Sequence, residues 1–265
     1  MLPVALTIAG SDSGGGAGIQ ADIKTMAALR VHGVSAITAI TAQNTVTVSE
    51  VLELPTGLIR AQIDRVVEDF QPAAAKTGML SSAEIIWTVA TAIREHGLSR
   101  LVVDPVMVAK GGARLLRQDA VEALRRELLP LAAVVTPNLP EAEVLLGHEI
   151  SSPEDRRRAA QDLLKLGPRA AVVKGGHAGG PASDVFYDGD EMLELTAERI
   201  QTGNTHGSGC AFSAAIAAGL ARGLGLVAAV RLAKDFITSA IADSLEIGSG
   251  HGPVNPMAGL LVNKS

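Results

Sequence analysis

Short apolar runs recur along the chain between segments whose apolar residues fall at helical spacing. The segment after Ser81 is an example: Ser81 and Glu84 have the spacing of a capping box, and Ile85, Val89 and Ile93 then share one helix face. Strands that alternate with helices form βαβ units around a parallel sheet. The sequence therefore predicts an α/β fold with three layers, αβα, around a mainly parallel central sheet. The predicted strands are residues 4–9, 34–42, 73–75, 101–103, 134–135 and 171–173.

Two segments depart from the parallel pattern. Residues 183–187 and 191–196 flank Asp188-Gly189, a dipeptide typical of a hairpin turn. We place this antiparallel hairpin at one edge of the sheet, and residues 46–54 partly alternate as an edge strand does. Neither a low-complexity linker nor an internal repeat interrupts the sequence, so residues 1–265 are expected to form a single domain.

Charge and cysteine content exclude several classes of protein. A net charge of -5 and the lack of a basic stripe argue against nucleic-acid binding. One cysteine leaves no internal disulfide framework. The start lacks the basic segment of a secretory signal, and the apolar part of residues 200–221 falls short of the roughly 20 residues that cross a bilayer. We therefore expect a cytoplasmic protein that binds neither nucleic acid nor membranes.

The stretch Asn204-Thr205-His206-Gly207-Ser208-Gly209-Cys210 leads into an Ala-rich, uncharged segment, residues 211–221. Gly-Ser-Gly ahead of a helix leaves backbone N–H groups uncovered where the helix dipole adds partial positive charge, so an anion site is predicted. Cys210 would lie in the first turn, where the same field favours a thiolate. An anion site beside a base suits phosphoryl or acyl transfer. The alternative is a tight turn followed by a buried cysteine.

Polar residues also follow the predicted strands at their C-terminal ends, the edge at which open α/β sheets bind ligands. Asp104 and Glu141 suit a Mg²⁺ ion held largely through water, and Lys174 suits a nucleotide phosphate. Each residue also has a structural interpretation, as a turn, a helix cap or a solvated side chain. The full set is Asp12, Gln43, Lys76, Asp104, Asn138 with Glu141, and Lys174.

A glycine loop follows the first predicted strand, at residues 10–18. No Gly-Lys-Ser/Thr ends it, so it is not a P-loop, and its glycines do not fit G-x-G-x-x-G. Strand, glycine loop and helix in this order still form a ligand-cradling arrangement. We expect this loop to hold a second substrate; the alternative is a tight connection between strand and helix.

Residues 10–22, Gly-Ser-Asp-Ser-Gly-Gly-Gly-Ala-Gly-Ile-Gln-Ala-Asp, resemble the opening motif of the hydroxymethylpyrimidine/phosphomethylpyrimidine kinases of thiamine biosynthesis. The resemblance implies a ribokinase-like fold, a homodimer, and an ATP- and Mg²⁺-dependent kinase. Its substrates would be 4-amino-5-hydroxymethyl-2-methylpyrimidine and then the monophosphate of that compound. Further similar segments come in the family's order: residues 43–45, 76–80, 104–107, 136–138 with Glu141, 174–177, 205–210 and 252–255.

The resemblance assigns the substrate side of the site to the first half of the chain. Gln43 would hydrogen-bond the aminopyrimidine ring, with Gly10, Met79 and Val106 packed around it. Asp12 would meet the hydroxymethyl group of the substrate.

The resemblance assigns catalysis to the stretch before the Ala-rich helix. Gly207, Ser208 and Gly209 would hold the transferring phosphoryl group through backbone N–H groups. Cys210 would take the proton of the substrate hydroxyl. Ser208 stands where the family usually has Thr, a change that leaves a backbone cradle intact.

The metal and nucleotide roles come from the same resemblance. Asp104 and Glu141 would organise Mg²⁺, with Asn138 near the triphosphate and Lys174 on it. Lys234, in the last long helix, would flank the nucleotide. Two further positions belong to the pattern. Lys110 with Gly111-Gly112 would lie over the phosphates, and Thr41 stands at a pocket-wall position that is often apolar.

Two alternatives remain open from the sequence. A pyridoxal or pyridoxine kinase shares the fold and the cysteine, although Gln43 and the complete opening motif favour the pyrimidine. A non-catalytic ligand sensor is the alternative from another class. It would not need Asp104, Glu141, Lys174 and Cys210 together.

Overall fold

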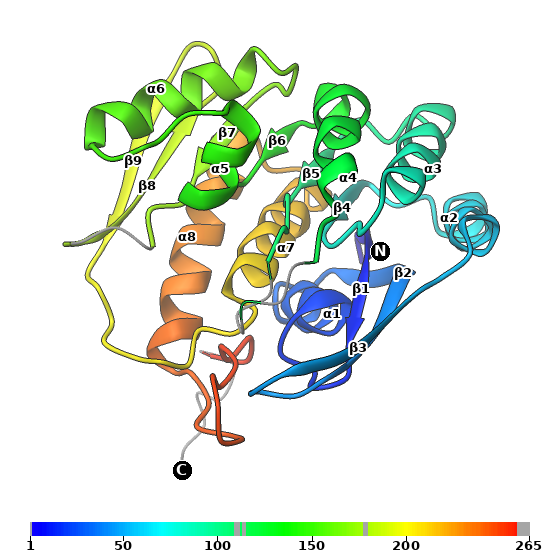
Figure 1. The fold of residues 1–265 in the computed structure, drawn as a ribbon, viewed down its shortest axis with the longest axis horizontal. Helices are drawn as coiled ribbons and strands as arrows, with labels where there is room; N and C mark the ends of the chain where they lie inside the picture. The colour runs from blue at the N-terminus through cyan, green and yellow to red at the C-terminus, as the bar shows by residue number, and fades with distance from the viewer. Residues whose placement is uncertain (1, 109–111, 113–114, 177–179, 259–265) are drawn as a thin grey trace.

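The computed structural model describes residues 2–108, 112, 115–176 and 180–258. Within these residues the strands form one nine-stranded sheet in the order β3-β2-β1-β4-β5-β6-β7-β8-β9 (Figure 1). The strands from β2 to β7 in this order pair in parallel, and β3, β8 and β9 are antiparallel. The bounds are β1 Val4–Asp12, β2 His32–Gln43, β3 Val48–Glu53, β4 Ala74–Thr77, β5 Leu101–Val103, β6 Val134–Val135, β7 Ala171–Val173, β8 Ala182–Tyr187 and β9 Met192–Ala197.

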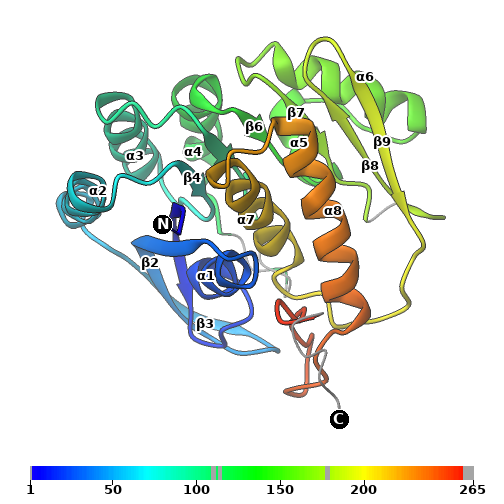
Figure 2. The same cartoon turned by 180° about the vertical axis from the view of Figure 1, so that it is seen from behind.

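Helices cover both faces of the sheet. One face carries α1, α7 and α8, and the other carries α2 to α6, as the two opposite views make plain (Figures 1 and 2). The predicted three-layer α/β fold is therefore confirmed. The bounds are α1 Gly18–Ala28, α2 Thr56–Phe70, α3 Ala83–Glu95, α4 Gln118–Ala123, α5 Leu139–Leu146, α6 Pro153–Leu164, α7 Ser208–Ala221 and α8 Leu226–Ala242, with a π-helical turn at Leu124–Leu128 and a 3-10 turn at Leu129–Leu131.

The short strands are apolar at every position because both of their faces are buried. In β5, Val102 packs toward α7 and α8, whereas Leu101 and Val103 pack toward the opposite helix layer. The Ala-rich α7 is buried throughout Ala211–Ala221. A helix that is apolar all round belongs inside a domain. Small side chains let α8 approach it closely, since a Cβ at Gly219 would stand 2.9 Å from the Ala229 Cβ atom.

The edges of the sheet agree with the predictions, and one helix start does not. The hairpin β8–β9 forms one edge, and β3 forms the other. The capping box at Ser81 and Glu84 is wrong, because α3 begins at Ala83 after Ser82 and has no side-chain cap. Glu84 Oε1 instead accepts a hydrogen bond from the Thr56 hydroxyl at 3.4 Å.

The strand order reverses at the centre of the sheet. From β1 the chain pairs outward to β2 and β3, then returns to place β4 on the other side of β1. In open parallel sheets such a reversal leaves a crevice at the carboxyl ends of the strands, where ligands bind. We therefore expect the site next to the ends of β1 and β4. No helix in the described part of the chain has both the length and the apolar character needed to cross a membrane.

Candidate active site

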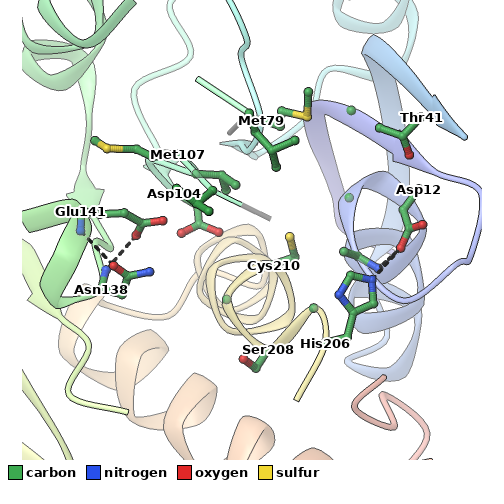
Figure 3. Close-up of a pocket in the computed structure, with 18 of the residues that line it drawn as sticks. Asp12, Thr41, Met79, Asp104, Met107, Asn138, Glu141, His206, Ser208 and Cys210 are labelled. Atoms are coloured by element: carbon green, nitrogen blue, oxygen red, sulfur yellow. Dashed lines mark hydrogen bonds and ion pairs between the residues drawn. The ribbon is translucent and has the colours of Figure 1, made fainter. Parts of the chain in front are cut away.

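A cavity of about 500 Å³ lies at this edge, next to the reversal of strand order. Figure 3 shows Cys210 at its centre, with Asp104 and Glu141 to one side and Asp12 with His206 to the other. Most predicted site residues line this cavity, whereas Lys76 and Lys234 do not. Those that line it are Gly10, Asp12, Gln43, Met79, Asp104, Val106, Asn138, Glu141, Lys174, Gly207, Ser208, Gly209 and Cys210.

A close backbone contact requires glycine at position 207, directly before α7. Gly207 caps the helix with a φ of 77°, and a Cβ there would stand 1.8 Å from the Gly16 carbonyl oxygen. The N–H group of Ser208 donates to the Thr205 carbonyl oxygen at 3.2 Å. Helix geometry leaves the next N–H groups, those of Gly209 and Cys210, for an anion in the cavity. The prediction also included the N–H groups of Gly207 and Ser208, and the Ser208 group is already bonded within the chain.

Burial, rather than the helix field, dominates the acidity of Cys210. Burial raises the pKa of the thiol to about 11, although Lys76 and a hydrogen bond from the Gly18 N–H group lower it. Asp22 and Asp104 raise it further. The predicted tendency toward thiolate is therefore wrong for the ligand-free protein, because desolvation outweighs the helix terminus.

Asp104 and Lys174 form an ion pair beside the anion site. Lys174 Nζ lies 3.0 Å from Asp104 Oδ1, and the Ser213 hydroxyl donates to Asp104 Oδ2 at 3.2 Å. Burial alone would raise the pKa of Asp104, but Lys174 and Lys76 hold it below its usual range. Burial lowers the pKa of Lys174, and Asp104 and Glu141 more than compensate. Both groups are therefore charged at neutral pH.

Glu141 belongs to a capping box at the start of α5. Its Oε2 accepts from the Asn138 N–H group at 2.8 Å, and Asn138 Oδ1 accepts from the Glu141 N–H group at 2.9 Å. The helix-cap interpretation of these two residues is thus correct, and both also line the cavity. Burial raises the pKa of Glu141 to about 7, with a further contribution from Asp104.

Two carboxylates that disfavour each other's charge in one cavity fit a divalent cation, because the cation would remove the repulsion. Within the described residues, no cluster of three or more histidine, cysteine or carboxylate side chains could hold a metal by itself. A cation between Asp104 and Glu141 would need phosphate and water oxygens as further ligands. That is how proteins usually hold Mg²⁺.

The opposite side of the cavity places the Gln43 amide beside apolar groups, next to Asp12 and His206. A Cβ at Gly10 would stand 3.1 Å from Met79 Sδ, so the thioether packs directly on the backbone. The carboxamide of Gln43 lies 3.2 Å from the Thr41 hydroxyl, which also donates to the Ser11 carbonyl oxygen at 2.9 Å. The hydroxyl of Thr41 is thereby satisfied within the wall, so the cavity there offers mainly the Gln43 amide for polar recognition.

His206 is a cavity residue that the sequence analysis did not single out. Its Nε2 lies 2.9 Å from Asp12 Oδ2, and both side chains are buried (Figure 3). Asp12 also accepts three backbone N–H groups of the glycine loop, from Gly14, Gly16 and Ala17. Burial alone would raise the pKa of Asp12, but His206 and these N–H groups hold it below its usual range. Asp12 thus organises the loop, and its contact with the substrate stays a prediction.

Lys76 does not reach the ligand edge as predicted. It is fully buried and binds Asp22 Oδ1 at 3.0 Å and Oδ2 at 2.8 Å, while the Thr7 hydroxyl donates to Asp22 at 2.6 Å. The alternation of β4 turns its side chain toward α1. No local signal distinguished it from the lysine that follows β7, because both come at the end of an apolar run.

A second cavity of about 250 Å³ adjoins the first and shares Asn138, Lys174, Ser208 and Gly209 with it. Lys234 lines this cavity, and its Nζ binds Asp184 Oδ2 and the Ala182 carbonyl oxygen, each at 2.8 Å. The predicted position beside a nucleotide is consistent with this cavity. Lys110, Gly111 and His177 lie outside the described residues.

The fold closely resembles those of solved vitamin kinases. The ADP complex of Bacillus subtilis pyridoxal kinase superposes with a TM-score of 0.92 at 42% identity, over 98% of this chain and 100% of that one. A Staphylococcus aureus pyridoxal kinase in complex with AMP-PCP and pyridoxal gives 0.91 at 38%, over 99% and 96%. The phosphomethylpyrimidine kinase of Clostridium difficile 630 gives 0.81 at 44%, over 90% and 99%. Fold and site together define a kinase of the ribokinase-like class.

Within that class the chain belongs to the phosphomethylpyrimidine kinase family, whose model matches residues 12–255. It is 54% identical over 259 residues to the hydroxymethylpyrimidine/phosphomethylpyrimidine kinase of Rhizobium meliloti (strain 1021), covering 96% of this chain and 97% of that protein. It is 51% identical over 256 residues to the protein of the same name in Bacillus subtilis (strain 168), covering 96% and 94%.

Proposed function

We propose that this chain is an ATP-dependent kinase that phosphorylates hydroxymethylpyrimidine and then the resulting monophosphate, for thiamine biosynthesis. The observation that carries the proposal is the composition of one cavity. It joins an apolar wall around the Gln43 amide, the N–H groups at the start of α7, and the Asp104–Lys174 pair. Family membership and 50–54% identity to named kinases of this pyrimidine support it.

The chemistry requires the protein mainly to position and neutralise charge, because phosphoryl transfer needs little covalent participation. The ring hydroxyl oxygen attacks the γ-phosphorus of ATP, the bond to ADP breaks, and the hydroxyl proton leaves. Lys174 and the N–H groups of Gly209 and Cys210 would receive the negative charge of the transferring group. Asp104 and Glu141 would hold Mg²⁺, which supplies charge neutralisation on the triphosphate when it is bound.

We assign the proton transfer of the first step to Cys210, which contributes about 10²–10⁴-fold where a base acts. Because burial raises the pKa of this thiol, the base must form in the complex with substrates rather than in the free protein. The second step differs. Its nucleophile is a phosphate oxygen whose second pKa of about 6 leaves it ionised at neutral pH, so it needs no base.

Pyridoxal kinase activity is the second candidate, and a specific observation favours it: solved pyridoxal kinases superpose with TM-scores of 0.91–0.92. Steady-state assays with Mg-ATP and each ring compound in parallel distinguish the two. The proposal predicts a kcat/KM for hydroxymethylpyrimidine well above that for pyridoxal. The reverse order would assign the chain to pyridoxal, and no phosphorylated product from any ring alcohol would favour a ligand sensor.

We also propose that residues 1–265 form one cytoplasmic domain that assembles as a homodimer and binds no nucleic acid. Continuity of the sheet from β3 to β9 supports the single domain. Exposed apolar side chains on the β2–β3 edge, Ile40, Val51 and Leu52, would form the contact between subunits. Sedimentation equilibrium of the wild type and of Leu52→Lys tests this, and a monomeric wild type would contradict it.

A further inference from the structure

We propose that His206 is a positioning residue that fixes both the glycine loop, residues 12–17, and the Gln43 amide for recognition of the ring. This inference rests on the proposed function, since it takes Gln43 as the ring ligand. The basis is one nitrogen atom that serves two groups. His206 Nε2 lies 2.9 Å from Asp12 Oδ2 and 3.5 Å from Gln43 Nε2.

The contact with Asp12 transmits the position of His206 to the whole glycine loop. The Asp12 carboxylate gathers the N–H groups of Gly14, Gly16 and Ala17 at 2.8–3.1 Å. Asp12 is only 3% exposed, so its charge depends on these donors and on the imidazole. A buried carboxylate that loses its strongest side-chain partner must recruit water or move. The loop would then lose the anchor shared by its N–H groups.

His206 itself is fixed from two sides. Its N–H group donates to the Gly252 carbonyl oxygen, and its carbonyl oxygen accepts from the Val254 N–H group, both at 3.1 Å. Its ring packs so closely on Gly16 that a Cβ there would stand 2.4 Å from Cδ2. This explains why the segment 252–255, remote in sequence, belongs to the motifs of the chain. It braces the backbone of His206.

The hydrogen-bond donors and acceptors around Gln43 determine the orientation of its amide group. In the structure Gln43 Nε2 faces His206 Nε2 at 3.5 Å, and Gln43 Oε1 accepts from the Thr41 hydroxyl at 3.2 Å. Facing a carboxylate, His206 Nε2 must carry a proton, so a hydrogen bond to the amide requires the two amide atoms to exchange places and the carbonyl oxygen to turn toward His206. In the exchanged orientation the Thr41 hydroxyl keeps its hydrogen bond to the Ser11 carbonyl oxygen at 2.9 Å and accepts from the amide nitrogen of Gln43.

That orientation presents one free N–H group and one oxygen lone pair of Gln43 to the cavity. An aminopyrimidine offers the complementary pair, a ring nitrogen that accepts next to an amino group that donates. A ring without an adjacent donor and acceptor cannot use both. His206 thereby fixes which side of the Gln43 amide offers the donor and which the acceptor, as well as the position of the loop.

The test compares His206→Leu, which removes the donor, with His206→Gln, whose amide nitrogen can still reach Asp12. Calorimetry measures the Kd of hydroxymethylpyrimidine and, separately, that of AMP-PCP with Mg²⁺. We expect the leucine variant to weaken pyrimidine binding by about 10–100-fold, the usual range for a hydrogen bond to a buried charge. AMP-PCP affinity should stay within about twofold, and the glutamine variant should recover most of the loss. His251→Leu is the matched control, because the His251 side chain is exposed and its ring contacts the Gly203 carbonyl oxygen, away from Asp12.

A second readout is independent of the pyrimidine. Cys210 is the only cysteine, and the N–H group of Gly18, directly after the loop, lowers the pKa of its thiol. Release of the loop should therefore speed alkylation of the ligand-free protein in His206→Leu but not in His206→Gln or His251→Leu. Unchanged pyrimidine affinity in His206→Leu, or equal loss of both ligands in both His206 variants, would overturn the positioning role. A wild type that fails to bind the pyrimidine would instead contradict the proposed function. The alkylation rates would still test whether His206 holds the glycine loop in place.

Discussion

Replacing Gly209 by alanine separates the stability of the anion site from its function. Gly209 is the second residue of α7 and has an ordinary helical φ, so alanine fits its backbone. A Cβ there would stand 3.3 Å from Lys174 Nζ and 3.7 Å from Asp104 Oδ2. The methyl group therefore projects into the space between the anion site and the ion pair, where the transferring phosphoryl group would lie.

The structure predicts opposite signs for the two effects. Alanine in place of glycine stabilises a helix by about 0.5–1 kcal/mol, and the nearest contact is the flexible end of a lysine that can give by a few tenths of an ångström. The expected change in Tm is a rise of about 1–4 °C. Turnover should fall by about 10²–10³-fold, the range for losing one donor to a transferring group.

Gly57→Ala provides the matched control. Gly57 is also the second residue of its helix, α2, and a Cβ there meets no atom within 4 Å. Thermal unfolding should show a similar small stabilisation in both variants, while steady-state assays should show normal turnover in Gly57→Ala only. Full turnover in Gly209→Ala would show that the start of α7 does not hold the phosphoryl group.

Three further predictions concern the buried ionisable groups Cys210, Lys76 and Glu141. Cys210→Ala should slow phosphorylation of the ring alcohol by about 10²–10⁴-fold but spare phosphorylation of the monophosphate, measured with each acceptor separately; equal losses in both steps would remove the base role. Lys76→Met should lower the free energy of unfolding in urea by about 3–5 kcal/mol, because it leaves the buried Asp22 carboxylate without its cationic partner. The double variant Lys76→Met/Asp22→Asn should recover part of that loss. The Tm of Glu141→Gln should rise relative to that of the metal-free wild type as the pH rises from about 5 to 8. In the wild type the Glu141 carboxyl, whose pKa is raised to about 7, lowers the stability of the folded state as it ionises, and glutamine does not. A constant difference in Tm across this range would mean that burial of Glu141 does not destabilise the folded protein.

The fold could be predicted because its determinants are local. Apolar runs such as residues 101–103 require burial on both faces, and only a covered parallel sheet provides it. The turn at Asp188-Gly189 likewise marks the hairpin β8–β9 within a few residues. The capping box at Ser81 failed because its spacing is satisfied in many turns, and the actual helix start one residue later has no side-chain cap.

The site could be predicted only where a residue follows a strand and faces the cavity. Asp104 and Lys174 meet this condition, and Lys76 does not, because one step in the alternation of β4 turns it inward. Contacts between segments that are far apart in the sequence could not be predicted from local patterns. The pairing of His206 with Asp12 joins residues 194 positions apart, and the acidity of Cys210 depends on burial that no local pattern reports.

Mass analysis of the products formed from hydroxymethylpyrimidine and excess Mg-ATP tests the central claim most directly. The arrangement of one ring pocket beside one phosphoryl site predicts a monophosphate that appears first and is then consumed, with the diphosphate as final product. Accumulation of the monophosphate alone would contradict the second step, and an unchanged substrate would contradict the assignment of this cavity to the pyrimidine.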